Sequence, residues 1–209
     1  MEKFTVLRGV AAPLLQPNIN TDAIIPAQWL ASTAHDLGEK LFAGWRYDLK
    51  GAEIPDFILN QPRYRASKIM IGGVNFGCGS SREAAVWALM RFGIRSVIAP
   101  SFGDIFFENS LQNGLVPVRV SIDEARRLAE QVAAAPEPLL TVDLTRDRVV
   151  APDGGEIAFS LPAERREALL EGLKEIDLLA RFADDVTAYQ AQDAVQRPWV
   201  YERSGGLLS

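Results

Sequence analysis

Three short apolar segments alternate with two helical segments, and this alternation is the feature that most constrains the fold of the chain. Each apolar segment has the length of a buried strand, and the three lie at residues 69–71, 96–100 and 115–120. The segments 84–92 and 101–113 carry apolar residues at helical spacing, and Gly93 and Gly114 follow where these helices would end. Strands that alternate with helices in this way form a substantially parallel sheet with right-handed crossovers. The sequence therefore predicts an α/β fold.

The second half of the chain predicts further helices and a small group of strands. Ser121 and Glu124 form the S-x-x-E pattern of a capping box, and residues 153–155 (Asp-Gly-Gly) are typical of a hairpin turn. The expected helices lie at 122–135, 163–173 and 176–192, and the expected strands at 139–144, 148–151 and 156–160. We expect residues 1–196 to form a single domain and residues 197–209 to be a polar, poorly ordered C-terminal tail.

Composition and charge narrow the class of protein. The 209 residues carry a net charge of −5, with a pI near 5.0, so a nucleic-acid-binding role has no electrostatic support. No uninterrupted apolar run reaches the length of a membrane span, and residues 1–4 lack the basic and then apolar pattern of a secretory signal. We therefore expect a cytoplasmic protein that binds neither nucleic acid nor membrane.

The counts of cysteine and histidine exclude several kinds of site. Cys78 is the one cysteine and His35 the one histidine, so an intrachain disulfide is impossible. A structural zinc site or an iron–sulfur cluster needs three or four such ligands. We therefore expect no metal site within this chain. A Ser-His-Asp triad is also disfavoured, because His35 lies in a polar stretch with no triad context.

Residues 72–83, G-G-V-N-F-G-C-G-S-S-R-E, form a glycine-rich loop between an expected strand and an expected helix. Its four glycines allow positive φ angles and a close approach of the backbone to a ligand. Backbone N–H groups at a helix N-terminus, with Arg82 beside them, favour an anion. The hydroxyls of Ser80 and Ser81 lie where loop becomes helix. This loop is the candidate site for chemistry.

Each candidate also has a purely structural interpretation. Ser80 with Glu83 three residues later matches a capping box, in which the serine would only satisfy helix N–H groups. The loop lacks the lysine of a phosphate-binding P-loop. In residues 18–26, N-I-N-T-D-A-I-I-P, Asp22 is either a carboxylate held at the edge of a site or part of an Asx turn before a short strand that ends at Pro26.

Three blocks of sequence together resemble one family, the small subunits of 3-isopropylmalate dehydratase (isopropylmalate isomerase), which are similar to the mobile swivel domain of aconitase. The blocks lie at residues 18–26, 75–83 and 98–118. The resemblance implies a swivelling β/β/α fold of the aconitase domain-4 type, with a mixed, largely parallel sheet and flanking helices. It also implies a large partner subunit that holds a 4Fe–4S cluster, to which Cys78 contributes no ligand, and a small dicarboxylate substrate.

The resemblance further implies a reaction, a pathway and a role for each candidate residue. The family interconverts 2- and 3-isopropylmalate in leucine biosynthesis by dehydration and rehydration through an alkene diacid. By position in the motif, Ser80 is the residue that takes the proton from the carbon next to the hydroxyl-bearing one. Arg82 and Ser81 would bind a substrate carboxylate, and Asp22 would orient polar groups at the same site. Thr21, Gly79 and His35 are the further residues expected to bind substrate.

Two departures from the family pattern leave other functions open. Residues 35–38, His-Asp-Leu-Gly, stand where relatives commonly carry R-T-G-F-G, and Ala84 stands where many carry histidine. A related small subunit acting on citraconate, 2-methylmalate, dimethylmaleate or maleate is therefore an alternative. A non-catalytic anion-binding domain, in which Ser80 is only a helix cap, is another. A free-standing hydrolase that uses Ser80 is the third, although it lacks a histidine base.

Overall fold

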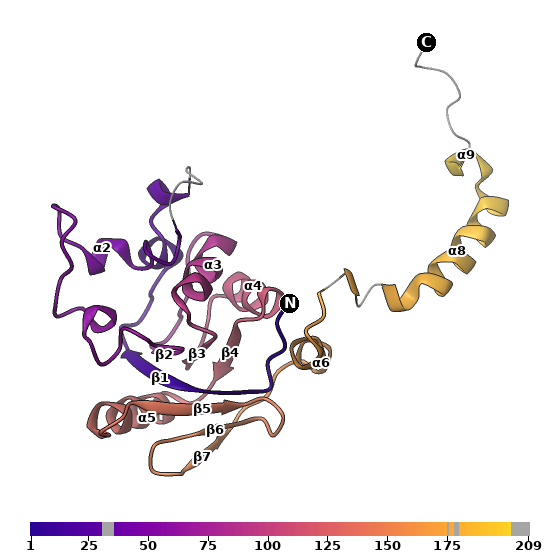
Figure 1. The fold of residues 1–209 in the computed structure, drawn as a ribbon. Helices are drawn as coiled ribbons and strands as arrows, with labels where there is room; N and C mark the ends of the chain where they lie inside the picture. Colours follow the sequence, from indigo (N-terminus) through magenta and orange to yellow (C-terminus); the bar gives the residue numbers. More distant parts are fainter. Residues whose placement is uncertain (31–35, 175, 178–179, 202–209) are drawn as a thin grey trace. The chain divides into compact units, whose positions relative to one another are not determined.

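The computed structural model describes residues 1–30, 36–174, 176–177 and 180–201 of the chain. Seven strands in this part of the chain form one sheet in the order β4-β3-β2-β1-β5-β6-β7 (Figure 1). They are β1 Val6–Leu14, β2 Ile69–Gly72, β3 Ser96–Ala99, β4 Val116–Arg119, β5 Leu139–Asp143, β6 Arg148–Val150 and β7 Glu156–Ala158.

The sheet is mixed, and its two halves meet at β1. Strands β1 to β4 run parallel to one another, with Ala11 opposite Ile69 and Ser96 opposite Val116. On the other side of β1, strands β5, β6 and β7 are antiparallel. The expected α/β fold with a mixed, largely parallel sheet is confirmed, as is the hairpin that joins the last two strands.

Helices flank the sheet on both faces. Helices α3 and α4 connect the parallel strands on one face, whereas α5 crosses the other face and contacts β1, β2 and β3 (Figure 1). Strands β2 and β3 are buried throughout because both faces of this half of the sheet are covered. The α-helices of this part are α1 Thr21–Ile24, α2 Ala43–Arg46, α3 Glu83–Phe92, α4 Asp104–Asn113, α5 Ile122–Ala134 and α6 Ala163–Glu171, and two 3₁₀ turns are η1 Ala27–Trp29 and η2 Ile58–Asn60.

The ends of the predicted helices are set by the residues that the sequence indicated. Gly93 and Gly114 adopt left-handed conformations after α3 and α4, and their N–H groups bond back to helix carbonyls. At the start of α5, the Ser121 side chain accepts from the N–H of Glu124, and the Glu124 carboxylate accepts from the N–H of Ser121. The N–H and the hydroxyl of Ser121 both donate to the Glu124 carboxylate and lower the pKa of Glu124. This capping box is confirmed.

The chain divides into two compact units, Met1–Gly172 and Leu173–Ser209. The second unit contains η3 Ala180–Phe182, α8 Ala183–Gln196 and α9 Pro198–Tyr201. Asp193 accepts hydrogen bonds from Arg197 and from the Tyr201 hydroxyl, which connects α8 with α9. The single domain over residues 1–196 stays a prediction. Part of the expected tail, residues 198–201, is helical, and residues 202–209 lie outside the described residues.

One local expectation about residues 18–26 is wrong. In place of a short strand before Pro26, the chain forms helix α1. Asn20 is its N-cap, and its side-chain oxygen accepts a hydrogen bond of 2.8 Å from the N–H of Ala23. An Asx turn before a strand was expected from the three polar residues, but a helix begins there because the Asn20 side chain supplies the acceptor that a helix start needs.

Candidate active site

Three loops meet at the carboxyl ends of parallel strands, where α/β proteins commonly bind ligands. They follow β1, β2 and β3 and cover residues 15–20, 73–82 and 100–103. Backbone hydrogen bonds join them: the N–H of Gly77 donates to Ile19 (2.7 Å), and the N–H of Gly103 donates to Phe76 (2.9 Å). The glycine-rich loop is therefore fixed by its two neighbours.

Gly77 and Gly79 are required by the path of this loop. Both have positive φ angles, +73° and +91°. A Cβ at Gly77 would overlap the ring of Phe106, and one at Gly79 would lie 3.3 Å from the Cβ of Asn20. The loop therefore passes close to α4 on one side and to the start of α1 on the other, which fixes the position of the residue that follows Gly79.

That residue, Ser80, is exposed, and a hydrogen bond to its backbone holds it in place. The hydroxyl of Thr21, which is buried, donates to the carbonyl of Ser80 over 2.9 Å. Helix α3 starts only at Glu83, and its N-cap residue, Arg82, makes no side-chain capping bond. The interpretation of Ser80 as a helix cap is therefore wrong. No described residue forms a hydrogen bond with the Ser80 hydroxyl, which leaves this hydroxyl available for chemistry.

Arg82 and Asp22 form an ion pair beside Ser80. The Nη1 atom of Arg82 donates to the Asp22 carboxylate and also to the carbonyl of Ile25 at 3.4 Å. The Arg82 side chain is 20% exposed and that of Asp22 54%. Asp22 lies in the first turn of α1, where a carboxylate is also favoured by the helix dipole. Helix α1 thus supplies both the carboxylate that orients Arg82 and the hydroxyl that holds Ser80.

A small pocket opens beside Ser80 between the glycine-rich loop and α4. Its volume is about 210 Å³, and it is lined by Gly77–Ser80 on one side and Gly103–Phe106 on the other. Asp104 and Ile105 begin α4, whose N-cap, Gly103, makes no side-chain bond. The first-turn N–H groups of a helix have no partner within the helix and favour a small anion, whereas the Asp104 carboxylate in the same lining opposes one.

The structure brings together most of the residues expected at the site. Asp22, Thr21, Gly79, Ser80 and Arg82 lie on the three joined loops and α1. Ser81 also lies on the glycine-rich loop and is exposed, and no described residue forms a side-chain hydrogen bond with it. His35 lies outside the described residues.

Two contributions were missed from sequence. Asn20 begins α1 and forms a parallel bridge with Cys78. The signal in the sequence was Asn20 directly before the residues of α1, a position typical of a helix N-cap. The pattern was interpreted as a turn before a strand. The first turn of α4 lines the pocket, and only the meeting of loops far apart in sequence reveals this.

The described residues contain no group of three or more His, Cys, Asp or Glu side chains that could hold a metal ion. Cys78 lines the pocket, but it is the single cysteine of the chain. These residues therefore do not fit a 4Fe–4S cluster, which takes three or four thiolate ligands. Among the described residues, no helix is both long and apolar enough to cross a membrane.

Comparison with known proteins decides the family. Residues 1–123 match the Aconitase C-terminal domain family. The chain is 50% identical over 205 residues to a 3-isopropylmalate dehydratase small subunit from Cupriavidus necator, with 96% of this chain and 99% of the relative covered. The chain belongs to the family of 3-isopropylmalate dehydratase small subunits. The chain is also 46% identical to a 3-isopropylmalate dehydratase small subunit from Paramagnetospirillum magneticum, and the match covers 96% of this chain and 100% of that relative.

The fold agrees with this family of small subunits. A crystal structure of 3-isopropylmalate dehydratase from Methanocaldococcus jannaschii superposes with a TM-score of 0.63 at 26% identity and covers 88% of this chain and 99% of its own. The resemblance seen in the three sequence blocks is confirmed, and so is the aconitase-type domain. Membership of a small-subunit family implies a large-subunit partner.

Proposed function

We propose that this chain is the small subunit of a two-chain hydro-lyase that interconverts 2- and 3-isopropylmalate by dehydration and rehydration in leucine biosynthesis. One observation of the structure carries the proposal: the exposed Ser80 stands on a fixed loop, two residues before the Arg82 that pairs with Asp22. An exposed hydroxyl beside a cation suits proton transfer next to a carboxylate. The family to which the chain belongs supplies the reaction.

We place the 4Fe–4S cluster on the large subunit, since the chain has one cysteine. Bound there, the cluster supplies a Lewis acid for the substrate hydroxyl. The pocket beside Ser80, at about 210 Å³, is smaller than the roughly 300–1,000 Å³ of common ligand sites. This size supports a site that is completed by the partner.

Ser80 is the proposed proton acceptor. A serine alkoxide is a costly base, so it needs nearby N–H groups and positive charge. The first turn of α4 and the guanidinium of Arg82 can provide them. The Nη1 atom of Arg82 donates to Asp22. The Nε and Nη2 atoms of Arg82 form no hydrogen bond with any described residue. Those two atoms can bind one substrate carboxylate in bidentate fashion.

The other site residues support Ser80 and Arg82. Ser81, which is exposed on the same loop, would add a hydroxyl to the carboxylate site. Gly79 lets the backbone approach the substrate. Thr21 is buried and its hydroxyl donates to Ser80, so we assign Thr21 a positioning role in place of the substrate contact expected from sequence. The contact of His35 with substrate stays a prediction.

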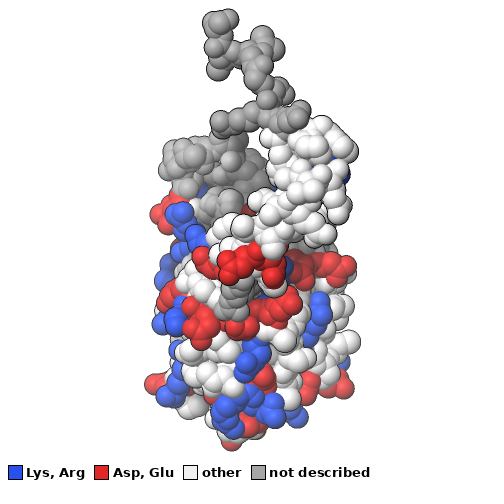
Figure 2. All heavy atoms as spheres, turned by 90° about the vertical axis from the view of Figure 1, so that its right-hand side faces the viewer, with Lys and Arg blue, Asp and Glu red and all other residues white. Residues whose placement is uncertain are grey.

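The surface charge supports a role that does not involve nucleic acid. On the face drawn in Figure 2, Lys and Arg side chains are scattered among Asp and Glu side chains. The described residues on this face form no continuous basic patch. Since phosphate backbones attract basic surfaces, a small dicarboxylate and a partner protein are the proposed ligands. A cytoplasmic location stays a prediction.

The test is Ser80→Ala in the enzyme reconstituted with its large subunit. We expect turnover of 2-isopropylmalate to fall by at least about a thousandfold, since a base and its proton transfer are lost. Ser160→Ala, at an exposed position after β7, is the matched control and keeps full activity. Near wild-type turnover by the Ser80 variant would remove this residue from the role of base.

The same reconstituted enzyme decides the substrate. Wild-type protein is assayed on 2-isopropylmalate, citraconate, 2-methylmalate, dimethylmaleate and maleate. We expect the highest kcat/KM on 2-isopropylmalate. Near-exclusive use of citraconate or maleate would overturn the proposed substrate and favour a related hydratase. Tight carboxylate binding without turnover of any of these acids would favour the non-catalytic alternative, and esterase activity of the lone chain would favour the hydrolase.

A further inference from the structure

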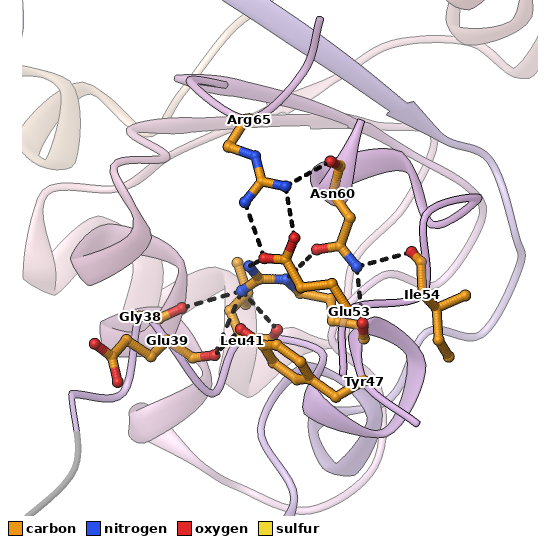
Figure 3. Close-up of polar contacts among 9 residues, drawn as sticks. Gly38, Glu39, Leu41, Tyr47, Glu53, Ile54, Asn60 and Arg65 are labelled. Carbon is orange, nitrogen blue, oxygen red and sulfur yellow. Dashed lines mark hydrogen bonds and ion pairs between the residues drawn. The ribbon is translucent and has the colours of Figure 1, made fainter. Parts of the chain in front are cut away.

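Arg46, at the end of α2, is a buried cation that the proposed reaction does not use. Its residue is 5% exposed. Its Nη1 atom lies 3.4–3.5 Å from the carbonyls of three residues of one turn, Gly38, Glu39 and Leu41 (Figure 3). One guanidinium nitrogen thus contacts three carbonyls of the same turn. Burial lowers the pKa of Arg46, as expected for a cation removed from water.

The other edge of Arg46 is held by a polar cluster (Figure 3). Its Nε donates to Asn60 over 3.0 Å, and its Nη2 lies 4.0 Å from the Glu53 carboxylate. Arg65 binds both oxygens of Glu53, at 2.9 and 2.6 Å, and donates to the carbonyl of Asn60. The amide of Asn60 donates to the carbonyls of Arg46 and Ile54. We call these four residues, Arg46, Asn60, Glu53 and Arg65, the Arg46 cluster.

The turn held by Arg46 leads directly to a strained residue. Phe42 has a φ of +52° in the left-handed region, which is unfavourable for an aromatic residue. Its ring is stacked on Trp45 and packs against Phe57, which favours this conformation. Strain of this kind persists only where the surroundings determine it, and it clusters at functional sites.

Phe42 connects the Arg46 cluster to α1. Its N–H donates to the carbonyl of Ile24 over 2.8 Å, at the C-terminal end of α1. Helix α1 is a single turn of four residues, so the carbonyl of Ile24 has no partner within the helix itself. Helix α1 carries Asp22 and Thr21, which hold Arg82 and Ser80. A continuous set of hydrogen bonds and short chain segments therefore leads from Arg46 to the site.

We propose that Arg46 is a positioning residue of this enzyme: its cluster fixes the 38–42 turn, which sets α1 and thereby the Arg82–Asp22 pair and the loop of Ser80. The proposal rests on the proposed function, in which Ser80 and Arg82 act on the substrate. Only a planar fork reaches Asn60 and three carbonyls together, so lysine cannot replace Arg46. A misplacement of about 1 Å at a reacting group can cost about a hundredfold in rate.

The test compares Arg46→Lys with Arg166→Lys. Arg166 is a matched control in the same unit: it binds Asp147, whose φ is +55°, and donates to the carbonyls of Leu144 and Thr145. At matched folded fraction, we expect Arg46→Lys to lower kcat by roughly ten- to a hundredfold. Its KM should change less than kcat, and its affinity for the large subunit should not change. Arg166→Lys should keep wild-type kcat.

Two further measurements separate positioning from general stability. In Arg46→Lys, but not in Arg166→Lys, the amides of Phe42 and Ile25 should exchange with solvent faster, since both bond to α1 carbonyls. The effects of Arg46→Lys and Asp22→Asn on kcat should be non-additive, because they act through the same helix.

Unchanged kcat in Arg46→Lys, an equal loss in the Arg166 variant, unchanged exchange at Phe42 and Ile25, or strictly additive effects would each overturn the proposal. Absence of isopropylmalate turnover in the wild-type enzyme would instead overturn the proposed function. The exchange comparison would still decide whether Arg46 sets α1.

Discussion

Arg82 donates from Nη1 to the carboxylate of Asp22, although 60 residues separate them in the chain. The contact exists because the loops after β1 and β2, which are adjacent parallel strands, leave the sheet at the same edge. The hydrogen bond to Asp22 orients the guanidinium of Arg82 through Nη1, so the Nε and Nη2 atoms can bind a ligand. The pair is partly exposed, so its contribution is to geometry more than to stability.

This geometry predicts unequal losses for the two partners. Arg82→Lys keeps the charge but loses the bidentate edge, and we expect kcat/KM to fall about a hundredfold, or about 2.7 kcal/mol. Asp22→Asn keeps a hydrogen-bond acceptor but loses the charge that orients Arg82, and a fall of about tenfold is expected. Steady-state kinetics of the reconstituted enzyme measures both. A larger loss for Asp22→Asn than for Arg82→Lys would contradict the assigned roles.

A second prediction concerns the path of the glycine-rich loop. Gly77→Ala places a methyl group against the ring of Phe106 at a positive φ. We expect the free energy of unfolding to fall by about 2–4 kcal/mol, the sum of backbone strain and overpacking. Gly154→Ala is the matched control, since its φ is +86° but its surroundings are open; it should cost only about 1 kcal/mol. Urea unfolding measures both, and equal losses would show that the contact with Phe106 is unimportant.

Much of the sheet and its crossovers could be predicted because the signals are local. Short apolar runs, helical spacing and the glycines after α3 and α4 each act within a few residues, and the structure places them as expected. The S-x-x-E pattern occurs at Ser121 and at Ser80, but it forms a capping box only at Ser121. At Ser80 it does not, because Gly79 turns to a positive φ and Thr21 holds the Ser80 carbonyl outside the helix.

The remaining features depend on contacts between distant segments. Nothing near Arg46 in the sequence indicates that its partners are Gly38, Asn60 and Glu53. The same holds for the α4 turn that lines the pocket beside Ser80. Through the resemblance to a family, the sequence predicts which residues belong to the site, but it could not show what holds them in place.

A third prediction is a dependence of stability on pH. The pKa of Asp143 lies below its usual value, chiefly because the Thr145 hydroxyl donates to it over 2.6 Å, with further bonds from the N–H groups of Thr145 and Arg146. A carboxyl whose folded pKa is lowered stabilises the fold above its unfolded pKa of about 3.9, and this contribution disappears as pH falls through the folded pKa. We expect Asp143→Asn to lower the free energy of unfolding by roughly 1 kcal/mol at pH 7.

The loss caused by Asp143→Asn should begin to shrink below about pH 4, where the carboxyl of the unfolded wild-type chain gains a proton, and it should disappear as pH falls through the lower pKa of the folded carboxyl. Thr145→Val removes the main donor and should show the same trend with pH. Urea unfolding at pH 7, 4 and 3 provides the measurement. A loss that stays constant over this range would mean that the charge of Asp143 is not what stabilises the turn.

The last prediction separates position from contact at the site. Thr21→Val has nearly the same shape but cannot donate to the Ser80 carbonyl, which the wild-type hydroxyl reaches at 2.9 Å. If Thr21 only positions Ser80, kcat should fall by about tenfold or more while KM changes little, because substrate binding rests on Arg82. Thr21→Ser restores the hydroxyl and should recover most of kcat. A rise in KM with unchanged kcat in the valine variant would instead show that Thr21 contacts the substrate directly, as the sequence first indicated.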